Sequence, residues 1–409
     1  MRKGKAGWRV ALPIALVVLL GLGLSGRADA SDTQEWVSAW GFSQQNLAPD
    51  TVTDATVRMI TRPTLSGSAV RVTLQNTFGS GPVQIGAAYV GVRANGALLV
   101  PGSNHPLTFA GASSVAIPPG GEVTSDPAPL QVRAQQDVAV SLYLPGTMVP
   151  ISRHTNARVT SFLTAPMAGN HAAEETATNF TVTTTSMYWV AAVDVLAGDK
   201  ASAIVCLGDS ITDGTGSTID GYDRWHDFLA LRLLMESKDQ RATVNEGIGG
   251  NRINPGGASP AAVERLDRDV LSRAGASHVI FFEGTNDIAN GATSAQVIAG
   301  SQEIIDRVKA AGLKIIGVTM IPRHNAAWTP QMTQYRREVN DWIRNHAEFD
   351  AVIDFDKVVR DPDNPDLINP IYDLGDHIHP NPYGYLIMGQ SIDLKLFKHD
   401  GPGHIPGGH

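Results

Sequence analysis

The hydrophobic pattern changes at about residue 200, and the part after this point has the stronger fold signal. Apolar stretches typical of buried strands lie at 203–208, 242–247, 278–284, 314–322 and 351–355. Stretches with apolar residues at helical spacing alternate with them, at about 224–238, 260–272, 294–312 and 330–347, and from about Pro382. Five strands with interleaved helices predict a parallel sheet covered on both faces, in three α/β/α layers.

Residues 31–200 show a different pattern. Short alternating runs such as VRVTLQNTF, VAVSLYL and MYWVAAVDVL are separated by turn sequences such as GSGP and PPGGE. This pattern predicts an all-β, jelly-roll-like sandwich. The 409 residues are enough for two cores. We therefore expect a sandwich over 31–200, an α/β domain over 201–398 and a flexible Gly/Pro/His-rich tail over 399–409.

Residues 1–30 have the three parts of a secretory signal peptide. Basic residues precede an apolar stretch from Val10 to Leu24, and Ala28-Asp29-Ala30 is a small-x-small cleavage site. This predicts cleavage after Ala30 and a secreted or periplasmic protein. The alternative, a transmembrane anchor, is disfavoured because the stretch is short and contains Pro13 and several glycines. We expect no stable membrane anchor.

Composition limits the partners and the chemistry. The sequence is 43% hydrophobic and 18% charged, which is typical of a globular protein. Its net charge is −8, and without residues 1–30, which carry five Lys/Arg and one Asp, it is about −12. Nucleic acid is therefore not an expected partner. The single cysteine, Cys206, lies inside an apolar strand candidate, where a thiol is usually inert packing.

Reactive residue types follow three strand candidates, at the sheet edge where ligands bind in α/β proteins. The segments are Gly208-Asp209-Ser210, 247–252 (GIGGNR), and Glu283-Gly284-Thr285-Asn286-Asp287, and a loop at 373–380 (DLGDHIHP) adds carboxylates and imidazoles. Acyl transfer needs such parts: a hydroxyl nucleophile, a histidine base, a carboxylate that orients it, and donors for the oxyanion. Candidate donors are the N–H groups of Ser210 and Gly250 and the amide of Asn286.

These segments together resemble the four blocks of the SGNH hydrolase superfamily, the GDSL-type esterases and lipases. The resemblance covers about residues 200–396 and implies a three-layer, flavodoxin-like α/β/α domain. The resemblance implies that Ser210 is the nucleophile, His379 the base and Asp376 the carboxylate that orients the base. It implies that the oxyanion donors are Ser210, Gly250 and Asn286. It also implies that no metal or organic cofactor is needed.

The sequence departs from the family pattern at one position and is ambiguous at another. Ile211 stands where the family has Leu, which loses no chemistry. Glycines at 247, 249 and 250 leave the oxyanion donor uncertain by one residue. Gly250 is favoured because it lies five residues after Asn245, as in family members that have Asn there.

Several of these residues could instead have a purely structural role. Ser210 alone would be read as a helix N-cap, and Asn286 as an Asx turn. Asp373, Asp376, His377 and His379 are also metal-ligand types, but no further ligand cluster accompanies them, and we expect no metal site. The roles of Arg224, Arg252, Asp287 and His377 stay open. Histidines outside the motifs are read as structural or solvated: His105, His154, His171, His226, His278, His324 and His346.

The expected function is that of a secreted serine esterase. Short acyl esters, such as acetyl esters, on small molecules or polysaccharides are the expected substrates, by analogy with exported carbohydrate esterases that carry a β-sandwich. A lipase, arylesterase or thioesterase of the same fold is an alternative, as is a non-catalytic glycan-binding protein. Trp36, Trp40 and Trp189 are candidate glycan platforms, although packing is the expected role of each. The sequence does not determine the oligomeric state.

Overall fold

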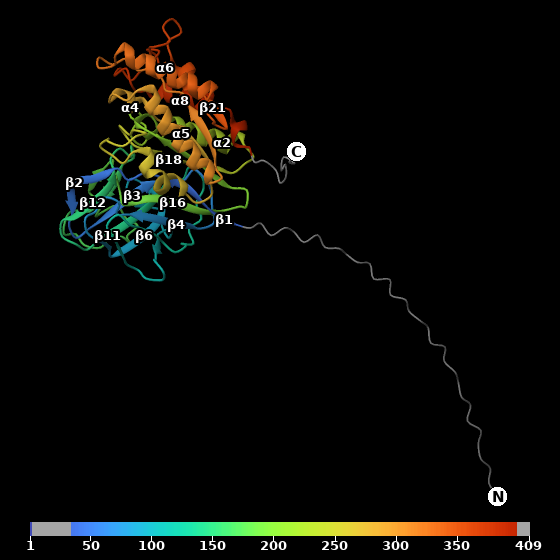
Figure 1. Cartoon of the computed structure of the whole chain (residues 1–409). Helices are drawn as coiled ribbons and strands as arrows, with labels where there is room; N and C mark the ends of the chain where they lie inside the picture. Colours follow the sequence, from blue (N-terminus) through green and yellow to red (C-terminus); the bar gives the residue numbers. More distant parts are fainter. Residues whose placement is uncertain (2–33, 399–409) are drawn as a thin grey trace. The chain divides into compact units, whose positions relative to one another are not determined.

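The predicted parallel sheet forms the centre of the C-terminal half (Figure 1). The computed structural model describes Met1 and residues 34–398, so the expected signal peptide and the tail at 399–409 lie outside the described residues. Five parallel strands pair in the order β18-β17-β19-β20-β21. Their bounds are β17 (Ser202–Gly208), β18 (Arg241–Gly247), β19 (Ala276–Phe282), β20 (Lys314–Val318) and β21 (Ala351–Ile353). This is the flavodoxin-like order, and it confirms the predicted fold class.

Helices connect the strands, and most lie where the periodicity predicts them. The longer ones are α2 (Trp225–Glu236), α5 (Ser294–Ala310), α6 (Pro330–Asn345) and α8 (Pro382–Ser391), and the short ones are α1 (Ser210–Asp213), α3 (Ala262–Leu266), α4 (Thr285–Ala289) and α7 (Phe355–Val359). Two expectations were wrong in detail. The helix expected at 260–272 is α3 followed by a π-helical turn at Asp267–Leu271, and the strand expected at 314–322 ends at Val318.

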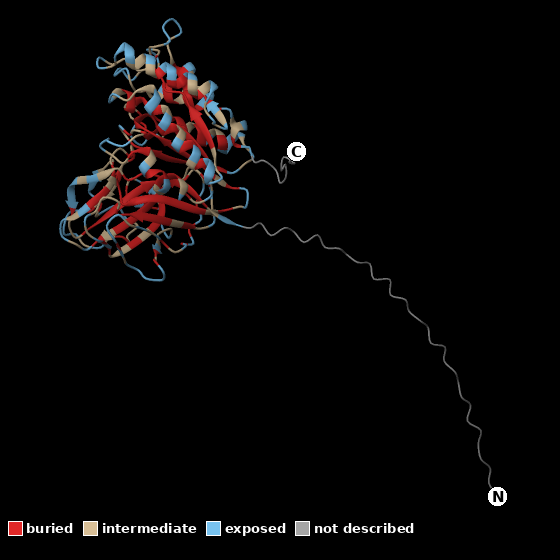
Figure 2. Cartoon of the chain, viewed as in Figure 1, coloured by how far each residue is buried: buried red, intermediate tan, exposed pale blue. Residues whose placement is uncertain are grey.

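Alternate residues of the sheet pack into two separate helical layers. Ile204, Cys206 and Ile280 face a core that contains Trp225 of α2 and Met388 of α8. Their neighbours Val205, Leu207 and Val279 face a core that contains Ile304 of α5 and Val339 of α6. Burial on both faces explains why these strands are almost continuously apolar, and Figure 2 shows the sheet as a buried layer.

The N-terminal half is built from antiparallel strands. One sheet has the order β1-β16-β4-β10, a second contains β14-β13-β3-β11-β6-β7 with β8 beside β6, a third is β15-β12-β2, and β5 pairs with β9. The longer strands are β1 (Glu35–Gly41), β2 (Asn46–Val52), β3 (Ala55–Thr61), β4 (Val70–Gln75), β6 (Ala87–Asn95), β11 (Val138–Leu144), β12 (Val149–His154) and β16 (Val190–Ala197). The shorter strands are β5 (Val83–Ile85), β7 (Leu98–Leu99), β8 (His105–Leu107), β9 (Val115–Ile117), β10 (Glu122–Thr124), β13 (Ser161–Leu163), β14 (Val182–Thr184) and β15 (Met187–Tyr188).

The core of this β region continues into the parallel sheet. The cluster of buried residues that holds Val37 and Trp189 also contains Ala203 of β17 and Ala242 and Val244 of β18. The β1 backbone contributes as well, since Ser38 N donates to Ala274 O at 2.9 Å. The two halves are therefore joined by this apolar core, which is separate from the two cores beneath the helical layers.

The tryptophans considered as glycan platforms are mostly covered. Trp189 is fully buried and Trp40 is 9% exposed. Trp36 is half-buried, and the guanidinium of Arg71 lies 4.8 Å from its ring centroid. These positions fit packing rather than glycan stacking. Among residues 34–398, no helix is both long and apolar enough to cross a membrane.

Candidate active site

The register of the sheet brings three of the sequence motifs to one level. Gly208, the last residue of β17, pairs with Gly247 of β18 on one side and with Phe282 of β19 on the other. The residues that follow these three positions therefore emerge side by side at the carboxyl edge of the sheet. The helix N-cap after β17 is Asp209, whose Oδ1 accepts from Ile211 N at 2.9 Å. Ser210 is the first residue of α1, so its side chain is not needed as the cap.

Ser210, His379 and Asp376 form a continuous chain of hydrogen bonds. Ser210 Oγ lies 2.8 Å from His379 Nε2, and His379 Nδ1 lies 2.6 Å from Asp376 Oδ2. Asp376 Oδ1 accepts the backbone N–H groups of Ile378 and His379, each at 2.9 Å. The loop therefore fixes the carboxylate, and the carboxylate fixes the ring.

The electrostatics of Asp376 favour its ionised form. Burial opposes ionisation, but the hydrogen bonds from His379 and from the Ile378 backbone outweigh it, and the pKa of Asp376 is lowered. An ionised carboxylate at this position stabilises an imidazolium at His379. The other histidine of the loop, His377, has a different partner: its Nδ1 lies 2.6 Å from Asp373 Oδ2.

The Gly-rich loop after β18 has one backbone donor left over. Gly247 N donates to Asn245 Oδ1 at 2.9 Å, and Gly249 N donates to Asp213 Oδ2 at 3.0 Å. Gly250 N has no acceptor among residues 34–398. Gly250 has a φ of +74°, and a Cβ built there would meet nothing within 4 Å. Of the three glycines, Gly250 is the one whose N–H is available to a ligand.

Asn286, at the start of α4, lies between the first and second motifs. Its Nδ2 donates to Asn251 O at 3.0 Å and makes a longer contact of 3.4 Å with Asp209 Oδ2. Its Oδ1 accepts from Arg323 Nη1 at 3.3 Å. The amide is thus oriented from both ends, and the longer contact to Asp209 is the weaker one.

Arg323 is a site residue that the sequence analysis missed. It lies in the loop after β20, and its guanidinium stacks over Trp328 at 5.2 Å from the ring centroid. Burial lowers its pKa, and the charges of Asp209 and Asp376 oppose that effect. This cation orients Asn286 and sits in the field of two carboxylates at the site. No local motif marks it.

Arg265 is a second missed residue, and it joins the ends of the first two strands. Its side chain is fully buried. It donates to Gly208 O at 3.1 Å, to Glu246 O at 2.7 Å and to Asn251 Oδ1 at 2.9 Å. One guanidinium therefore links the end of β17, the end of β18 and the Gly-rich loop.

Two further acidic residues lie near the strand ends outside the serine–histidine–aspartate chain. Asp287 is buried and accepts the N–H groups of Ile253 and Asn254 at 2.9 and 3.0 Å, which holds the loop beyond Gly250. Glu283 Oε1 is 3.6 Å from Arg265 Nη2, beyond hydrogen-bond distance. Burial, reinforced by the charge of Asp209, raises the pKa of Glu283 well above its ordinary value.

His154 of β12, in the β region, contacts α1 next to this site. His154 Nε2 lies 3.0 Å from Asp213 Oδ1, and its Nδ1 lies 2.9 Å from Ser43 O. Its ring stacks on Phe42 with centroids 4.5 Å apart. Asp213 belongs to α1 and also holds Gly249 N, so His154 acts on the Gly-rich loop through one carboxylate.

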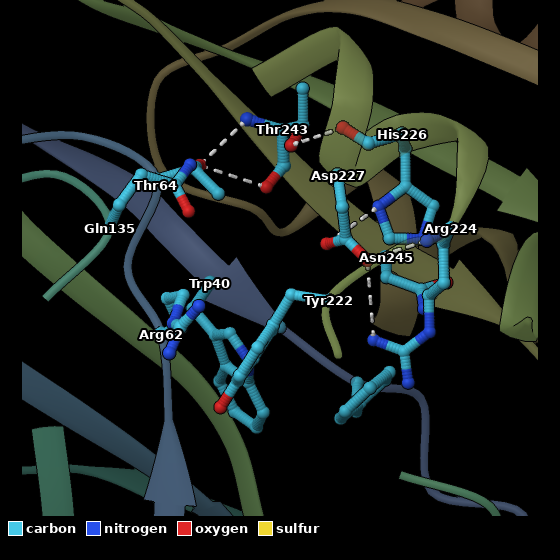
Figure 3. Close-up of a pocket in the computed structure, with 12 residues that line it drawn as sticks. Trp40, Arg62, Thr64, Gln135, Tyr222, Arg224, His226, Asp227, Thr243 and Asn245 are labelled. Carbon is cyan, nitrogen blue, oxygen red and sulfur yellow. Dashed lines mark hydrogen bonds and ion pairs between the residues drawn. The ribbon is translucent and has the colours of Figure 1, made fainter. Parts of the chain in front are cut away.

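Arg224, whose role the sequence left open, lines a small pocket between the β region and α2 (Figure 3). The cavity is about 30 Å³, room for about one water molecule and too small for an ester substrate. Neighbouring lining residues include Arg62, Tyr222 and Asp227. Trp225 is fully buried beneath it, so its role is packing.

A larger polar hollow adjoins the second and third motifs. It has a volume of about 420 Å³, and its lining includes Arg252, Asn254, Asp287 and Gln296. Arg252 and Asp287 line this same hollow. Burial raises the pKa of Asp287, and hydrogen bonds from Ile253 and Asn254 and the charge of Arg252 oppose that rise only in part. Asp287 directly follows Asn286 in the sequence and Arg252 is two residues after Gly250, but neither donor lines the hollow itself.

Cys206 behaves as expected for a packed thiol. It is fully buried in β17, and burial raises the pKa of its thiol well above the ordinary value. Among residues 34–398, one group of three metal-ligand side chains lies outside the serine–histidine–aspartate chain. Ligand atoms of His324, Asp373 and His377 lie within 4.8 Å of one another.

Comparison with known proteins identifies the C-terminal half. The sequence model of the GDSL-like Lipase/Acylhydrolase family matches residues 206–387. Residues 206–387 are therefore a GDSL-like lipase/acylhydrolase domain, and the chain carries a hydrolase of carboxylic esters. A search of curated proteins found no match.

Solved structures similar to this half include three with descriptive names. A member of the lipolytic protein G-D-S-L family from Veillonella parvula is 22% identical, with 46% of this chain and 95% of that chain covered and a TM-score of 0.38. A GDSL-like lipase from Bacteroides thetaiotaomicron is 21% identical, with coverage of 46% and 84% and a TM-score of 0.37. A psychrotrophic esterase from Pseudoalteromonas sp. is 18% identical, with coverage of 46% and 93% and a TM-score of 0.36.

Proposed function

We propose that this chain is a secreted serine esterase that removes short acyl groups, such as acetyl, from carbohydrates. The observation that carries the proposal is the hydrogen-bond chain from Ser210 through His379 to Asp376, at 2.8 and 2.6 Å. Export is proposed from the leader pattern at residues 1–30.

The reaction follows from the arrangement of these groups. His379 Nε2 takes the proton of Ser210 as Oγ attacks the ester carbonyl, and ionised Asp376 stabilises the imidazolium. The carbonyl oxygen becomes an oxyanion that accepts from the N–H groups of Ser210 and Gly250 and from Asn286 Nδ2, which exchanges its long contact with Asp209 for this one.

The acyl-enzyme then forms and is hydrolysed. The tetrahedral intermediate collapses, and the alcohol leaves with the proton from His379, so that the acyl group stays on Ser210. Water next attacks the acyl-enzyme and gives its proton to His379. The second collapse releases the acid and returns the proton to Ser210 Oγ.

The polar hollow lined by Arg252 and Asp287 supports a carbohydrate as the alcohol. Arg252, Asn254 and Gln296 offer hydrogen-bond groups along a volume of about 420 Å³. A sugar carries several hydroxyl groups and needs such partners when it binds. The acyl group, in contrast, needs only a small space near Ser210.

A lipase-like preference for longer acyl groups is the second candidate, and one observation favours it. Ile371 and Leu374 border the loop that carries Asp376 and His379, and their exposures are 57% and 41%. Exposed apolar side chains at this position would cover the chain of a longer acyl group. Replacing Leu374 with Ser should then reduce activity on long esters while activity on acetate stays the same.

The deciding experiment combines hydrolysis with covalent labelling. p-Nitrophenyl esters of increasing acyl length and acetylated xylan are given to the wild type, to Ser210→Ala and to Ser391→Ala, an exposed serine of the same domain that serves as control. We expect acetyl esters to be cleaved best, Ser210→Ala to be inactive but folded, and Ser391→Ala to equal the wild type. A fluorophosphonate should label the peptide that contains Ser210.

Other results would change the proposal. Near-normal hydrolysis by Ser210→Ala removes the serine mechanism. A preference for long acyl chains supports the lipase, and cleavage of thioesters in preference to esters supports a thioesterase. Tight glycan binding by a folded protein that is never labelled supports the non-catalytic alternative.

A further inference from the structure

Three metal-ligand side chains meet beside the serine–histidine–aspartate chain without belonging to it. His324 comes from the loop after β20, and Asp373 and His377 come from the loop before α8. A ligand atom of each lies within 4.8 Å of the others. The rings of His324 and His377 are stacked, with centroids 4.4 Å apart and an interplanar angle of 27°. The sequence analysis lacked the third ligand, because His324 is about fifty residues from the other two and carries no motif.

The immediate surroundings hold these side chains in place. Asp373 is 7% exposed at its side chain, and its Oδ1 accepts Gly375 N at 2.9 Å and His377 N at 3.1 Å. Its Oδ2 points to His377 Nδ1 at 2.6 Å. His324 N donates to His377 O at 3.0 Å, which ties the two loops together through the backbone. Outer hydrogen bonds of this kind fix the orientation of metal ligands.

Two features indicate that the cluster has unused binding capacity. His324 Nδ1 is buried and has no hydrogen-bond partner among the described residues. His377 has a φ of +62°, an unfavourable conformation for a residue with a Cβ. Such strain is commonest at functional sites.

The ligand set suits divalent first-row transition metals, zinc among them. Two imidazoles and one carboxylate are typical zinc ligands, and zinc sites with three protein ligands complete their tetrahedron with water. Ligands at about 2.0–2.1 Å from zinc in a tetrahedron are about 3.4 Å apart. The Nδ1–Oδ2 distance between His377 and Asp373, 2.6 Å, has to open by about 0.8 Å. The distances to the His324 ligand atom lie within 4.8 Å and have to close by at most about 1.4 Å.

We propose that His324, Asp373 and His377 bind one zinc-class divalent ion, which fastens the loop at 373–379 to the loop after β20. The neutral tautomer of His377 that carries its proton on Nε2 binds zinc through Nδ1, and the zinc replaces the hydrogen bond between Nδ1 and Asp373 Oδ2. Asp376 and His379 lie on the same loop, so the ion restrains the segment that carries the proposed base without entering the acyl-transfer chemistry. The ion is a positioning element, and the proposal stands whether or not Ser210 is the nucleophile.

The test measures binding directly on the full chain. Protein freed of metal with a chelator is titrated with ZnCl₂ by calorimetry and with CoCl₂ by visible absorption, in which tetrahedral Co²⁺ has intense d–d bands. The variants are His324→Gln and Asp373→Asn. Two controls accompany them: His346→Gln, an exposed histidine 3.6 Å from Asp341, and a double variant in which His404 and His409 of the tail become Gln.

We expect one Zn²⁺ per chain with micromolar or tighter affinity, a tetrahedral Co²⁺ spectrum and a higher Tm with zinc. His324→Gln and Asp373→Asn should each weaken binding at least tenfold, while His346→Gln, the tail variant and Ser210→Ala bind as the wild type does. His324→Gln keeps the backbone contact to His377, so it tests the site even if Asp373→Asn disturbs the loop. Absence of binding, or binding lost only in the tail variant, would overturn the proposal.

Discussion

His154 Nε2 lies 3.0 Å from Asp213 Oδ1, and this buried contact joins the β region to the helix that begins at Ser210. Both side chains are fully buried. The same carboxylate holds Gly249 N at 3.0 Å, one residue from the available donor at Gly250. The β region therefore contributes to the geometry of the site through His154, a positioning residue.

His154→Leu should lower both stability and turnover. It leaves Asp213 buried without its imidazole partner, which costs roughly 3 kcal/mol in the free energy of unfolding. The Gly-rich loop loses a fixed support, so kcat should fall about tenfold while KM stays nearly constant. Urea unfolding and steady-state kinetics measure the two effects.

Two further variants make the His154 test specific. His171→Leu breaks a partly exposed pair with Glu174 in the same β region, and should cost less than about 1 kcal/mol. His154→Gln restores a donor to Asp213 and should recover part of kcat. Wild-type kinetics in a folded His154→Leu protein would show that the contact does not position the loop.

The three glycines after β18 should respond to alanine in different ways. Ala at 247 would place its Cβ 2.2 Å from Asp213 N, so Gly247→Ala should destabilise the fold by about 3 kcal/mol or more. Ala at 249 meets only Asp213 Oδ2, at 3.4 Å, and should be nearly neutral. Gly250→Ala meets nothing but strains a φ of +74°. It should cost about 1 kcal/mol and lower kcat at least tenfold by shifting an oxyanion donor.

Thermal unfolding and ester hydrolysis on the three variants separate these effects. The informative comparison is between positions 249 and 250, because both variants should remain folded. If Gly249→Ala loses more activity than Gly250→Ala, the donor has been assigned to the wrong residue.

Arg265→Met should strongly destabilise the protein. The change removes a fully buried guanidinium that donates to Gly208 O, Glu246 O and Asn251 Oδ1. These acceptors then stay buried without a donor, and a loss of roughly 3–5 kcal/mol follows. Arg307→Met on α5, at a partly exposed arginine, should cost about 1 kcal/mol or less. Chemical denaturation of both proteins checks the contrast, and equal losses would argue against a special role for Arg265.

Asp209 should make stability depend on pH between about 4 and 7. Burial raises its pKa to about 7 from 3.8, opposed by the Ile211 N–H and by Arg323 and assisted by Asp287 and Asp213. Because the folded-state pKa lies above the unfolded-state value, the contribution of Asp209 is fully present below pH 4 and is lost as pH rises to about 7. The loss is up to about 4 kcal/mol.

Asp209→Asn isolates this contribution. The amide oxygen still accepts from Ile211 N, so the cap remains. Relative to the wild type, the variant should become more stable as pH rises from 5 to 8 in urea unfolding. Parallel pH profiles of the two proteins would show that Asp209 does not titrate in this range.

The sequence predicts those parts of the molecule that have a local signature. β17 and β19 are apolar on both faces, and such strands stand out as continuous runs. Ser210, Asn286, Asp376 and His379 lie in short motifs whose strand or loop context could be read directly. The π-helical turn at Asp267–Leu271 was not predicted, since a π turn and an α turn have nearly the same apolar spacing.

Residues that act across the fold were missed for a physical reason. His154, Arg265, Arg323 and His324 each make at least one contact to a residue far away in the sequence, and each is a single polar residue in an ordinary strand, helix or loop. His154 and Asp213 are 59 residues apart. Only the register of the sheet and the packing of the two halves bring such pairs together.

The apolar core shared between Val37, Ala203, Ala242 and Val244 has an evolutionary consequence. A hydrolase domain that arose alone would present polar side chains at the positions of Ala242 and Val244, because solvent would cover that end of the sheet. Exchange of the hydrolase segment with another gene would expose this surface in the recipient. Substitutions at this surface in one half therefore constrain those in the other, although the proposed chemistry belongs to only one half.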